Sequence, residues 1–503
     1  MKNRNKDINM LEGPLLGKVI GFILPLIATN MLQVLYNAAD MVIAGMSGVP
    51  GAIGSIGTTA AMINLILNIF MGFSVGTNVV VARSIGRGDR DATSAAVHSS
   101  LIVGLITGFI CSIICFFVSR PVLSLLGDRG HVLELASLYT KIYSLGIPFM
   151  ALSNFLIAIF RAKGDTRTPL YVLSASGLLN VVLNCFFVLV CGMSVDGVAY
   201  ATVISNAVSM ALLAIVLSRD TGWCRLEMKK LRLHRSAVKE IIRDGLPAGI
   251  QGALFSLSNM LIQSSIIGFN NELCPGGSDI IDGNAAASSL EAFIYVATNS
   301  VYQAAVTFTS QHHGARKYKR IGLVMRCCYL VTGAIAVIGT LILMLFHTPL
   351  LKLYVDSESA ISTALIRMDI MIIPYFLLAF MEVGSGVLRG LGRSTTSTVV
   401  SLIGSCLFRI VWIQTVCRIF HSLEVVYLSY PISWGLTALT HFLISMRIRR
   451  HYMAEYPEEV SAPNELPVSE GESFALNSRG ESMLKFSDAF DRTDGGVALG
   501  YTS

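Results

Sequence analysis

The chain has 503 residues, of which 53% are hydrophobic and only 14% are charged, whereas soluble proteins contain about 25% charged residues. The mean hydropathy is +0.63, and the apolar residues come in blocks of about 20, the length of a helix that crosses a bilayer. This composition excludes an ordinary soluble protein. The net charge of +6 does not indicate a nucleic-acid partner, because the excess basic residues lie in short loops between apolar blocks.

The apolar blocks predict an all-α membrane protein with twelve transmembrane helices. In chain order, the first six spans are expected at 15–45, 52–82, 93–118, 132–160, 168–190 and 196–218. The other six are expected at 241–269, 283–310, 321–346, 359–388, 396–417 and 423–446. Helices are predicted rather than a β-barrel because the runs are continuously apolar and do not alternate.

The loops between the predicted spans differ in charge. Basic residues cluster in the N-terminal segment, in the loops after the second, fourth, sixth, eighth and tenth spans, and in "RIRRH" after the last span. Intervening loops such as "MSGVPG" and "CGMSVDG" are poor in Lys and Arg. Since basic loops remain in the cytoplasm, both termini are predicted to be cytoplasmic and the protein to lie in the cytoplasmic membrane.

These boundaries divide the chain into five segments. Residues 1–14 are a cytoplasmic N-terminal segment, 15–218 an N-lobe of six helices, 219–240 a basic cytoplasmic loop and 241–450 a C-lobe of six helices. Residues 451–503 are polar, acidic and rich in Ser and Gly. They are predicted to form a disordered cytoplasmic tail, because they cannot bury enough apolar surface to become ordered.

The two halves of the chain repeat each other. Four pairs of residues recur in the same order, with separations of 226, 226, 222 and 222: Pro148 and Pro374, Gly88 and Gly314, Pro25 and Pro247, Asn37 and Asn259. Each half has an even number of predicted spans, so the two halves share one orientation. Parallel repeats of this kind are typical of secondary transporters, whose sites lie near the middle of the membrane.

The sequence indicates neither an ATPase nor another enzyme. No stretch matches the phosphate-binding pattern G-x-x-x-x-G-K-[ST], so ATP hydrolysis through that motif is excluded. A membrane enzyme acting on lipid would need a clustered nucleophile, metal set or acid/base pair, and no such cluster is visible. We therefore expect no cofactor, and transport driven by an ion gradient or by the substrate's own gradient.

Four motifs together resemble the multidrug and toxic compound extrusion (MATE) family, prokaryotic type. They are "P…Q..YN..D…..G" in the first span, "RAKGDTRTP" after the fourth, "SQHHGARKYKRI" after the eighth and "LRGLGRS" after the tenth. The likeness runs from about Pro14 to Arg450. It implies cation-coupled antiport of amphipathic, often cationic organic compounds. It also implies two six-helix lobes around a central cleft that opens alternately to each side.

An acidic residue inside the first span is a functional candidate, because a buried charge costs about 2.5–3.5 kcal/mol at the centre of a span. The residue is Asp40. The predicted cation site consists of Asp40, Asn180, Asn184 and Thr202, and the resemblance implies the roles of Asp40, Asn180 and Thr202 in it. Asn184, one helical turn after Asn180, is neutral where some family members carry Asp. The sequence does not decide between Na⁺ and H⁺ as the coupling ion. A Na⁺ ion would be bound by Asp40, Asn180 and Thr202. The alternatives are a carboxylate wetted by outside water and two amides that only bond neighbouring helices.

A second group of residues is predicted to bind the substrate or to carry a proton. Glu291 and Glu382 lie inside the eighth and tenth spans, and Glu382 resembles a tenth-span acid of the family. The alternative for both is an ion pair with an intramembrane base such as Arg409. Gln33, Tyr36 and Asn37, just before Asp40, are expected to face the same cavity. Pro25 is predicted to be a hinge that couples ion binding to cavity shape, the alternative being a static kink.

The alternative function is a flippase for a lipid-linked oligosaccharide or other amphipathic lipid precursor, because such flippases belong to the same wider superfamily. An anionic pyrophosphate would call for several inward-facing Arg or Lys residues. The intramembrane acids Asp40, Glu291 and Glu382 outnumber the clear bases, chiefly Arg409, and this favours cationic substrates. A positive cavity would reverse that preference. The Gly-Arg loops containing Arg161 and Arg389 are expected to orient spans and form turns. We predict a monomer whose partners are a small organic molecule and the lipid bilayer, with no nucleic acid.

Overall fold

The computed structural model describes residues 7–125, 130–275 and 277–456, and in this part of the chain helices are joined by turns and loops, with no β-strand. The helices of the first half are α1 (Leu15–Gly45), α2 (Ala52–Arg87), α3 (Arg90–Leu125), α4 (Gly130–Lys163), α5 (Arg167–Cys185) and α6 (Val195–Ser218). Those of the second half are α7 (Arg235–Leu273), α8 (Asp279–Gly314), α9 (Tyr318–Leu351), α10 (Glu358–Met371), α11 (Tyr375–Gly390), α12 (Ser394–Ser401), α13 (Phe408–Gln414), α14 (Val416–Ile419) and α15 (Leu423–Glu455). π-helical turns at Phe186–Val190 and Leu402–Leu407 extend α5 and join α12 to α13.

All twelve predicted spans coincide with helical segments, but the number that crosses a membrane stays a prediction. Among the described helices, nine are long and apolar enough to cross, or ten if α10 and α11, bent by 53° at their break, form one span. α8 and α15 are equally long but less apolar. Both bury polar side chains inside the protein, among them Glu291 on α8 and His441 on α15.

Large apolar side chains on the outer faces of the helices identify a multi-pass membrane protein. Phe117, Val190, Leu345 and Ile419 are each between 73% and 76% exposed. In water, this surface would cost about 25 cal/mol for each Å². Lipid tails remove that cost, so these faces are the ones that contact the bilayer.

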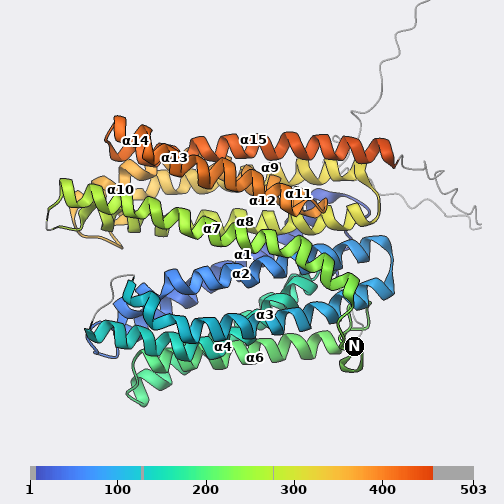
Figure 1. Cartoon of the computed structure of the whole chain (residues 1–503), viewed down its shortest axis with the longest axis horizontal. Coiled ribbons are helices and arrows are strands. Elements are labelled where there is room, and N and C mark those ends of the chain that lie inside the picture. The colour runs from blue at the N-terminus through green and yellow to red at the C-terminus, as the bar shows by residue number, and fades with distance from the viewer. Residues whose placement is uncertain (1–6, 126–129, 276, 457–503) are drawn as a thin grey trace, which may run out of the picture. The chain divides into compact units, whose positions relative to one another are not determined.

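The helices form two groups that follow the two halves of the sequence. In Figure 1, helices from residues 15–218 (blue to green) and those from residues 235–455 (green to red) gather on opposite sides. One apolar core is built within residues 262–438, and another within residues 43–203. We use the names N-lobe and C-lobe for these two groups.

α1 contacts both lobes. Its first half packs Phe22 and Leu26 into a core with residues of α8, α9 and α11. Its second half lies against α5, where the Tyr36 hydroxyl donates to the carbonyl of Ser174. A displacement of α1 would therefore act on both lobes.

The two lobes meet where glycines let α2 and α7 approach closely. Gly72 and Gly76 on α2 face Gly245 and Gly249 on α7, so each helix presents a small-xxx-small pair at the crossing. A Cβ atom at Gly72 would lie 2.0 Å from the backbone nitrogen of Gly249. Only glycine permits this contact.

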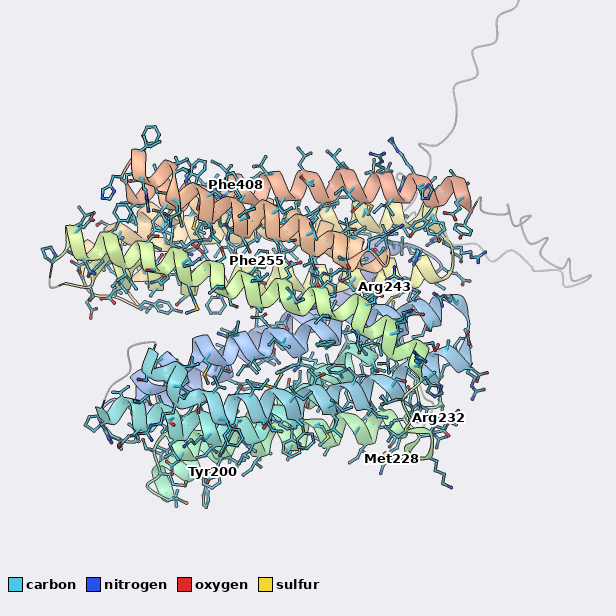
Figure 2. The ribbon with its side chains drawn as sticks, in the orientation of Figure 1. Tyr200, Met228, Arg232, Arg243, Phe255 and Phe408 are labelled. Carbon is cyan, nitrogen blue, oxygen red and sulfur yellow. The ribbon has the colours of Figure 1, made fainter. Side chains whose placement is uncertain are left out.

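An ion pair joins the lobes beyond the glycine crossing. Arg83 on α2 lies 3.0 Å from Asp244 and 3.4 Å from Glu240, both on α7. We call this end of the helices, where Arg83, Arg87, Arg243 and Arg393 line one small pocket, the basic end. Figure 2 labels Arg243, which belongs to the basic end, and Phe255, which lies farther along α7. The lobes are in tight contact at and beside the basic end.

Two predicted boundaries differ from the structure. α7 begins at Arg235 rather than at 241, so the inter-lobe loop is shorter than predicted. α15 continues to Glu455, and Tyr452 stacks on Tyr318 with ring centroids 5.2 Å apart. The predicted tail therefore begins after this aromatic contact. The rest of the tail, 457–503, and residues 1–6 lie outside the described residues.

Candidate functional site

Asp40 lies near the end of α1 with its side chain buried against the neighbouring helix. The residue is 9% exposed. Its Oδ1 accepts a hydrogen bond of 2.5 Å from Nδ2 of Asn184 on α5. The carboxylate therefore points neither into bulk water nor into lipid. The alternative of an interfacial acid wetted by outside water requires an exposed carboxylate, so it does not fit this position.

Asn184 links Asp40 to the two other residues of the predicted cation site. The same Nδ2 donates to Oδ1 of Asn180 at 3.2 Å, and Nδ2 of Asn180 donates to Oγ1 of Thr202 on α6 at 3.4 Å. Asn180 and Asn184 share a helix face because they are four residues apart. All four predicted residues thus form one hydrogen-bonded chain across α1, α5 and α6.

The oxygen atoms of these four hydrogen-bonded side chains suit a small cation. Carboxylate, amide and hydroxyl oxygens are the ligands that hard cations prefer. Oδ1 of Asn184 is buried and has no hydrogen-bond partner, an expensive arrangement that a bound cation would relieve. A Na⁺ ion would sit among the oxygens of Asp40, Asn180, Asn184 and Thr202, whereas H⁺ would be carried by the carboxyl group of Asp40.

The sequence analysis did not identify two tyrosines of α4 that lie in the region of Asp40. Tyr139 and Tyr143 on α4 both interact electrostatically with Asp40, and their ring centroids are 5.8 Å apart. They belong to the same apolar core as Ile43 and Ala44, which follow Asp40 on α1. Their four-residue spacing places them on one face of α4, but nothing in the sequence indicates that this face meets α1.

A cavity of about 820 Å³ lies between the two lobes, within the range of roughly 300–1,000 Å³ usual for small-molecule sites. The N-lobe contributes residues of α1, α2, α4 and α5, and the C-lobe those of α7, α8, α10, α11, α13 and α15. Gln33 and Asn37 line it, as the sequence predicts, and so does Phe255. Asn37 lies three residues before Asp40, so α1 joins the cavity to the cation site.

Tyr36 does not line the cavity, and its predicted position is wrong. Its ring packs on α5, where a Cβ atom at Gly177 would lie 1.9 Å from the ring. Its hydroxyl donates to the carbonyl of Ser174 at 3.3 Å. Tyr36 follows Gln33 by three residues, but its side chain is directed to the helix neighbour because a glycine there leaves room for it.

Glu291 lines the cavity, but it is neutralised by an arginine that the sequence analysis did not consider. Arg367 on α10 donates from Nε and Nη2 to the two carboxylate oxygens at 2.9 and 2.7 Å. Its Nη1 donates to Asn284 at 2.6 Å. The ion pair therefore joins Glu291 to Arg367 and not to Arg409. This bidentate geometry is the strongest form of such a pair.

We expect Glu291→Gln to lower the free energy of unfolding by about 3–5 kcal/mol, because it leaves the buried Arg367 without its carboxylate. The double variant Glu291→Leu with Arg367→Met should recover most of that loss. Thermal unfolding in detergent measures both effects. Glu272→Gln, at an exposed pair with His421, is the matched control and should change stability by less than about 1 kcal/mol. Unchanged stability in Glu291→Gln would contradict the structural role.

The cavity contains more arginine than the sequence suggests. Its charged lining residues are Glu291, Glu382, Arg161, Arg367, Arg389 and Arg409. Four bases against two acids make the expectation that acids outnumber bases wrong, and Asp40 is not part of this lining. The basis for preferring cationic substrates is therefore removed.

Arg161 and Arg389, predicted to be loop residues, belong to helices. They lie near the ends of α4 and α11 and are 9% and 2% exposed. The signal that could have found them was their repeat spacing, since the two residues are 228 apart, close to the 226 that separates other repeat partners. Equivalent arginines in the two lobes thus point into one cavity.

Glu382 and Pro25 lie where the sequence places them. Glu382, on α11, lines the cavity and interacts electrostatically with Arg389. Pro25 lies inside the continuous helix α1, where the carbonyl of Pro25 accepts a hydrogen bond from Thr29 at 2.7 Å. Its action as a hinge stays a prediction.

Comparison with known proteins agrees with this architecture. The MatE family model matches residues 25–186 and again residues 247–413, once in each half. The chain is 23% identical over 434 residues to the probable multidrug resistance protein YoeA of Bacillus subtilis (83% of this chain, 90% of the relative). It is 24% identical over 395 residues to the probable multidrug resistance protein NorM of Thermotoga maritima (77% of this chain, 82% of the relative).

A solved structure has the same fold. It is an outward-facing multidrug resistance MATE family transporter of the MOP superfamily, with a TM-score of 0.81 and 21% identity over 90% of this chain and all of the other. The likeness covers both lobes. Two matches to one family model, a duplicated helical fold and a cavity between the lobes lead to one conclusion: the chain belongs to the MatE family of membrane transporters.

Proposed function

We propose that the protein is a cation-coupled antiporter that exports amphipathic organic compounds across the cytoplasmic membrane by alternating access. The observation that carries the proposal is the hydrogen-bonded chain from Asp40 to Thr202, one helical turn from the inter-lobe cavity on α1. Relatives named as multidrug resistance proteins support the export of organic compounds.

The coupling step follows from the position of α1. A cation at Asp40 neutralises the buried carboxylate and satisfies Oδ1 of Asn184, so it stabilises the contact between α1 and α5. An ion changes the balance between two conformations only if it binds one of them more tightly. Because α1 also packs on α8 and α9, this preference is transmitted to both lobes.

The predicted membrane orientation, with the basic end in the cytoplasm, would give the direction of export. If the basic end lies in the cytoplasm, the contacts between α2 and α7 close the cavity on that side in the present conformation. Separation of the lobes at those contacts would open the cavity to the cytoplasm. Entry of Na⁺ or H⁺ from outside would then drive one cycle of export.

The test uses purified protein in vesicles with Na⁺ and H⁺ gradients imposed separately. Efflux of a cationic and an anionic fluorescent dye is followed in each case. The proposal predicts that one of the two gradients drives dye movement and that dissipating this gradient stops it. Movement of neither dye under either gradient would contradict antiport.

The excess of arginine in the cavity favours the flippase alternative as a second candidate. A flippase would move an anionic lipid precursor between leaflets, and its rate would not depend on an ion gradient. The same vesicles distinguish the two, because a labelled anionic lipid would then change leaflet without any imposed gradient.

A further inference from the structure

The positive charge of the cavity is not balanced by its own acids. Of the four arginines and two glutamates that line it, the bidentate pair of Arg367 with Glu291 neutralises one of each. Three arginines remain against one carboxylate, that of Glu382. In described residues, no salt bridge joins any of these four groups.

Arg161 is the clearest case of an uncompensated charge. It is 91% buried, since 9% of it is exposed, and the described residues offer its side chain neither a hydrogen bond nor an ion pair. Its Nε is fully buried without a partner. Holding an ionised guanidinium in this state is costly, so a ligand that supplies negative charge would be strongly favoured there.

Arg389 is held in place by neutral oxygens. Its Nη2 donates to Oε1 of Gln251 at 2.8 Å, and Ser385 and Ser394 lie at 3.5 Å from Nε and Nη1. The hydroxyl of Ser394 is itself fixed by the carbonyl of Asp244 at 2.6 Å. These contacts orient the guanidinium without neutralising it.

The two arginines line the same cavity from opposite lobes. Arg161 comes from the N-lobe and Arg389 from the C-lobe, and Tyr302 on α8 lines the cavity with them. Glu382 also lines it. Beside Tyr302, Glu382 is thus the single carboxylate that offsets these two guanidinium groups.

Apolar and aromatic groups lie on the C-lobe side of the same cavity. Arg409 sits over the ring of Tyr430 at 4.2 Å and near that of Trp434 at 5.9 Å, and its Nε donates to Ser433. Trp434 and Phe255 also line the space. A compound with an apolar body has a surface to contact here.

We propose that the exported compound is an amphipathic anion, whose carboxylate, sulfonate or phosphate binds between Arg161 and Arg389 beside Tyr302. The inference rests on the proposed export function and specifies its substrate class. Arginine suits this role because its fork binds such oxygens through two parallel hydrogen bonds. Contact with both lobes at once also lets the anion stabilise the present arrangement of the lobes.

The test measures binding of three probes that share one fluorophore and differ in charge. Dansylglycine is anionic, dansylglycinamide is neutral and dansylcadaverine is cationic, and each is titrated into purified protein in detergent. We expect dansylglycine to bind at least about tenfold more tightly than dansylcadaverine, since hydrogen bonds to charged groups have effects of this order. Equal affinities, or tighter binding of the cation, would overturn the proposal.

Variants assign the effect to the two arginines. Arg161→Gln and Arg389→Gln should each weaken dansylglycine binding about tenfold or more and leave dansylglycinamide nearly unchanged. Because both contact one anionic group, the double variant should lose less than the product of the single losses. Arg120→Gln, at an exposed position on α3, is the matched control. Size-exclusion profiles confirm folding, and Arg161→Lys supplies a folded variant that keeps the charge if Arg161→Gln does not fold.

Two further arms separate the sources of the anion. Phosphatidic acid in nanodiscs is tested as a competitor of dansylglycine: competition identifies a lipid headgroup, and its absence identifies a soluble organic anion. Binding in detergent needs no ion gradient, so failure of coupled export in vesicles would leave this result intact. Conversely, coupled export of the cationic probe alone would overturn the anion site while leaving the antiporter standing.

Discussion

Asp40→Asn is expected to abolish ion-driven export while leaving the protein folded and able to bind its substrate. Asparagine has nearly the same shape as aspartate and can keep a hydrogen bond to Asn184, but it can neither carry a proton nor supply negative charge to Na⁺. The chain from Asn184 to Thr202 should persist. The measurement is dye efflux from vesicles with Na⁺ and H⁺ gradients imposed separately, and we expect no gradient-dependent efflux under either.

Two comparisons make this result specific. Asp356→Asn changes an exposed carboxylate and should export like the unmodified protein. Dansylglycine binding by Asp40→Asn in detergent should also be normal, because Asp40 does not line the cavity. Gradient-driven efflux at the normal rate in Asp40→Asn would remove Asp40 from the coupling mechanism.

The second large effect is expected from Gly72→Ala at the crossing of the lobes. One added Cβ atom would lie 2.0 Å from the backbone nitrogen of Gly249 and 2.3 Å from its Cα. Backbone atoms cannot turn aside as a side chain can, so the contact must open. Overpacking of this kind costs about 1–3 kcal/mol, which corresponds to roughly a 5–150-fold shift between two conformations. We therefore expect export to slow by a similar factor, and double electron–electron resonance across the crossing to show the lobes farther apart.

Gly57→Ala is the matched control on the same helix. No atom lies within 4 Å of the Cβ position at Gly57, and alanine favours a helix by about 1 kcal/mol over glycine. This variant should be as active as the unmodified protein and equally or more stable. If Gly72→Ala behaved in the same way, the close packing of α2 on α7 would have no part in transport.

The cation site was accessible from the sequence because local rules determine most of it. Asp40 is conspicuous as a charge in an apolar run, and Asn180 and Asn184 share a face through their four-residue spacing. Resemblance to a family supplied the pairing of these helices with Thr202. The structure then adds the hydrogen bonds that join them, and the core that Tyr139 and Tyr143 form with the end of α1.

The charges of the cavity could not be predicted in the same way. Helical spacing gives the face on which Arg367 lies, but not which distant helix brings Glu291 to it. Arg161 and Arg389 lie within two residues of a helix end or of a loop, where predictions of element boundaries err by several residues. A small error there turns a cavity residue into a loop residue.

Buried polar side chains explain why α8 is not among the nine described helices that are apolar enough to cross a membrane. α8 carries many buried hydroxyl and amide groups that bond within the protein, such as Thr307, whose hydroxyl donates to Asn78 at 3.1 Å. Hydropathy treats such residues as unfavourable in a membrane, although their neighbours replace water. The apolar blocks of the sequence nevertheless predict a span at 283–310, within α8.

The most direct test of the account measures lobe separation as a function of the coupling ion. Spin labels at His131 and Ser362, exposed positions on α4 and α10 away from the basic end, report the distance between the lobes by double electron–electron resonance. The account predicts that Na⁺ or a lower pH shifts the distance distribution in the unmodified protein and has no effect in Asp40→Asn. An identical ion-dependent shift in both proteins would contradict the claim that cation binding at Asp40 sets the conformation.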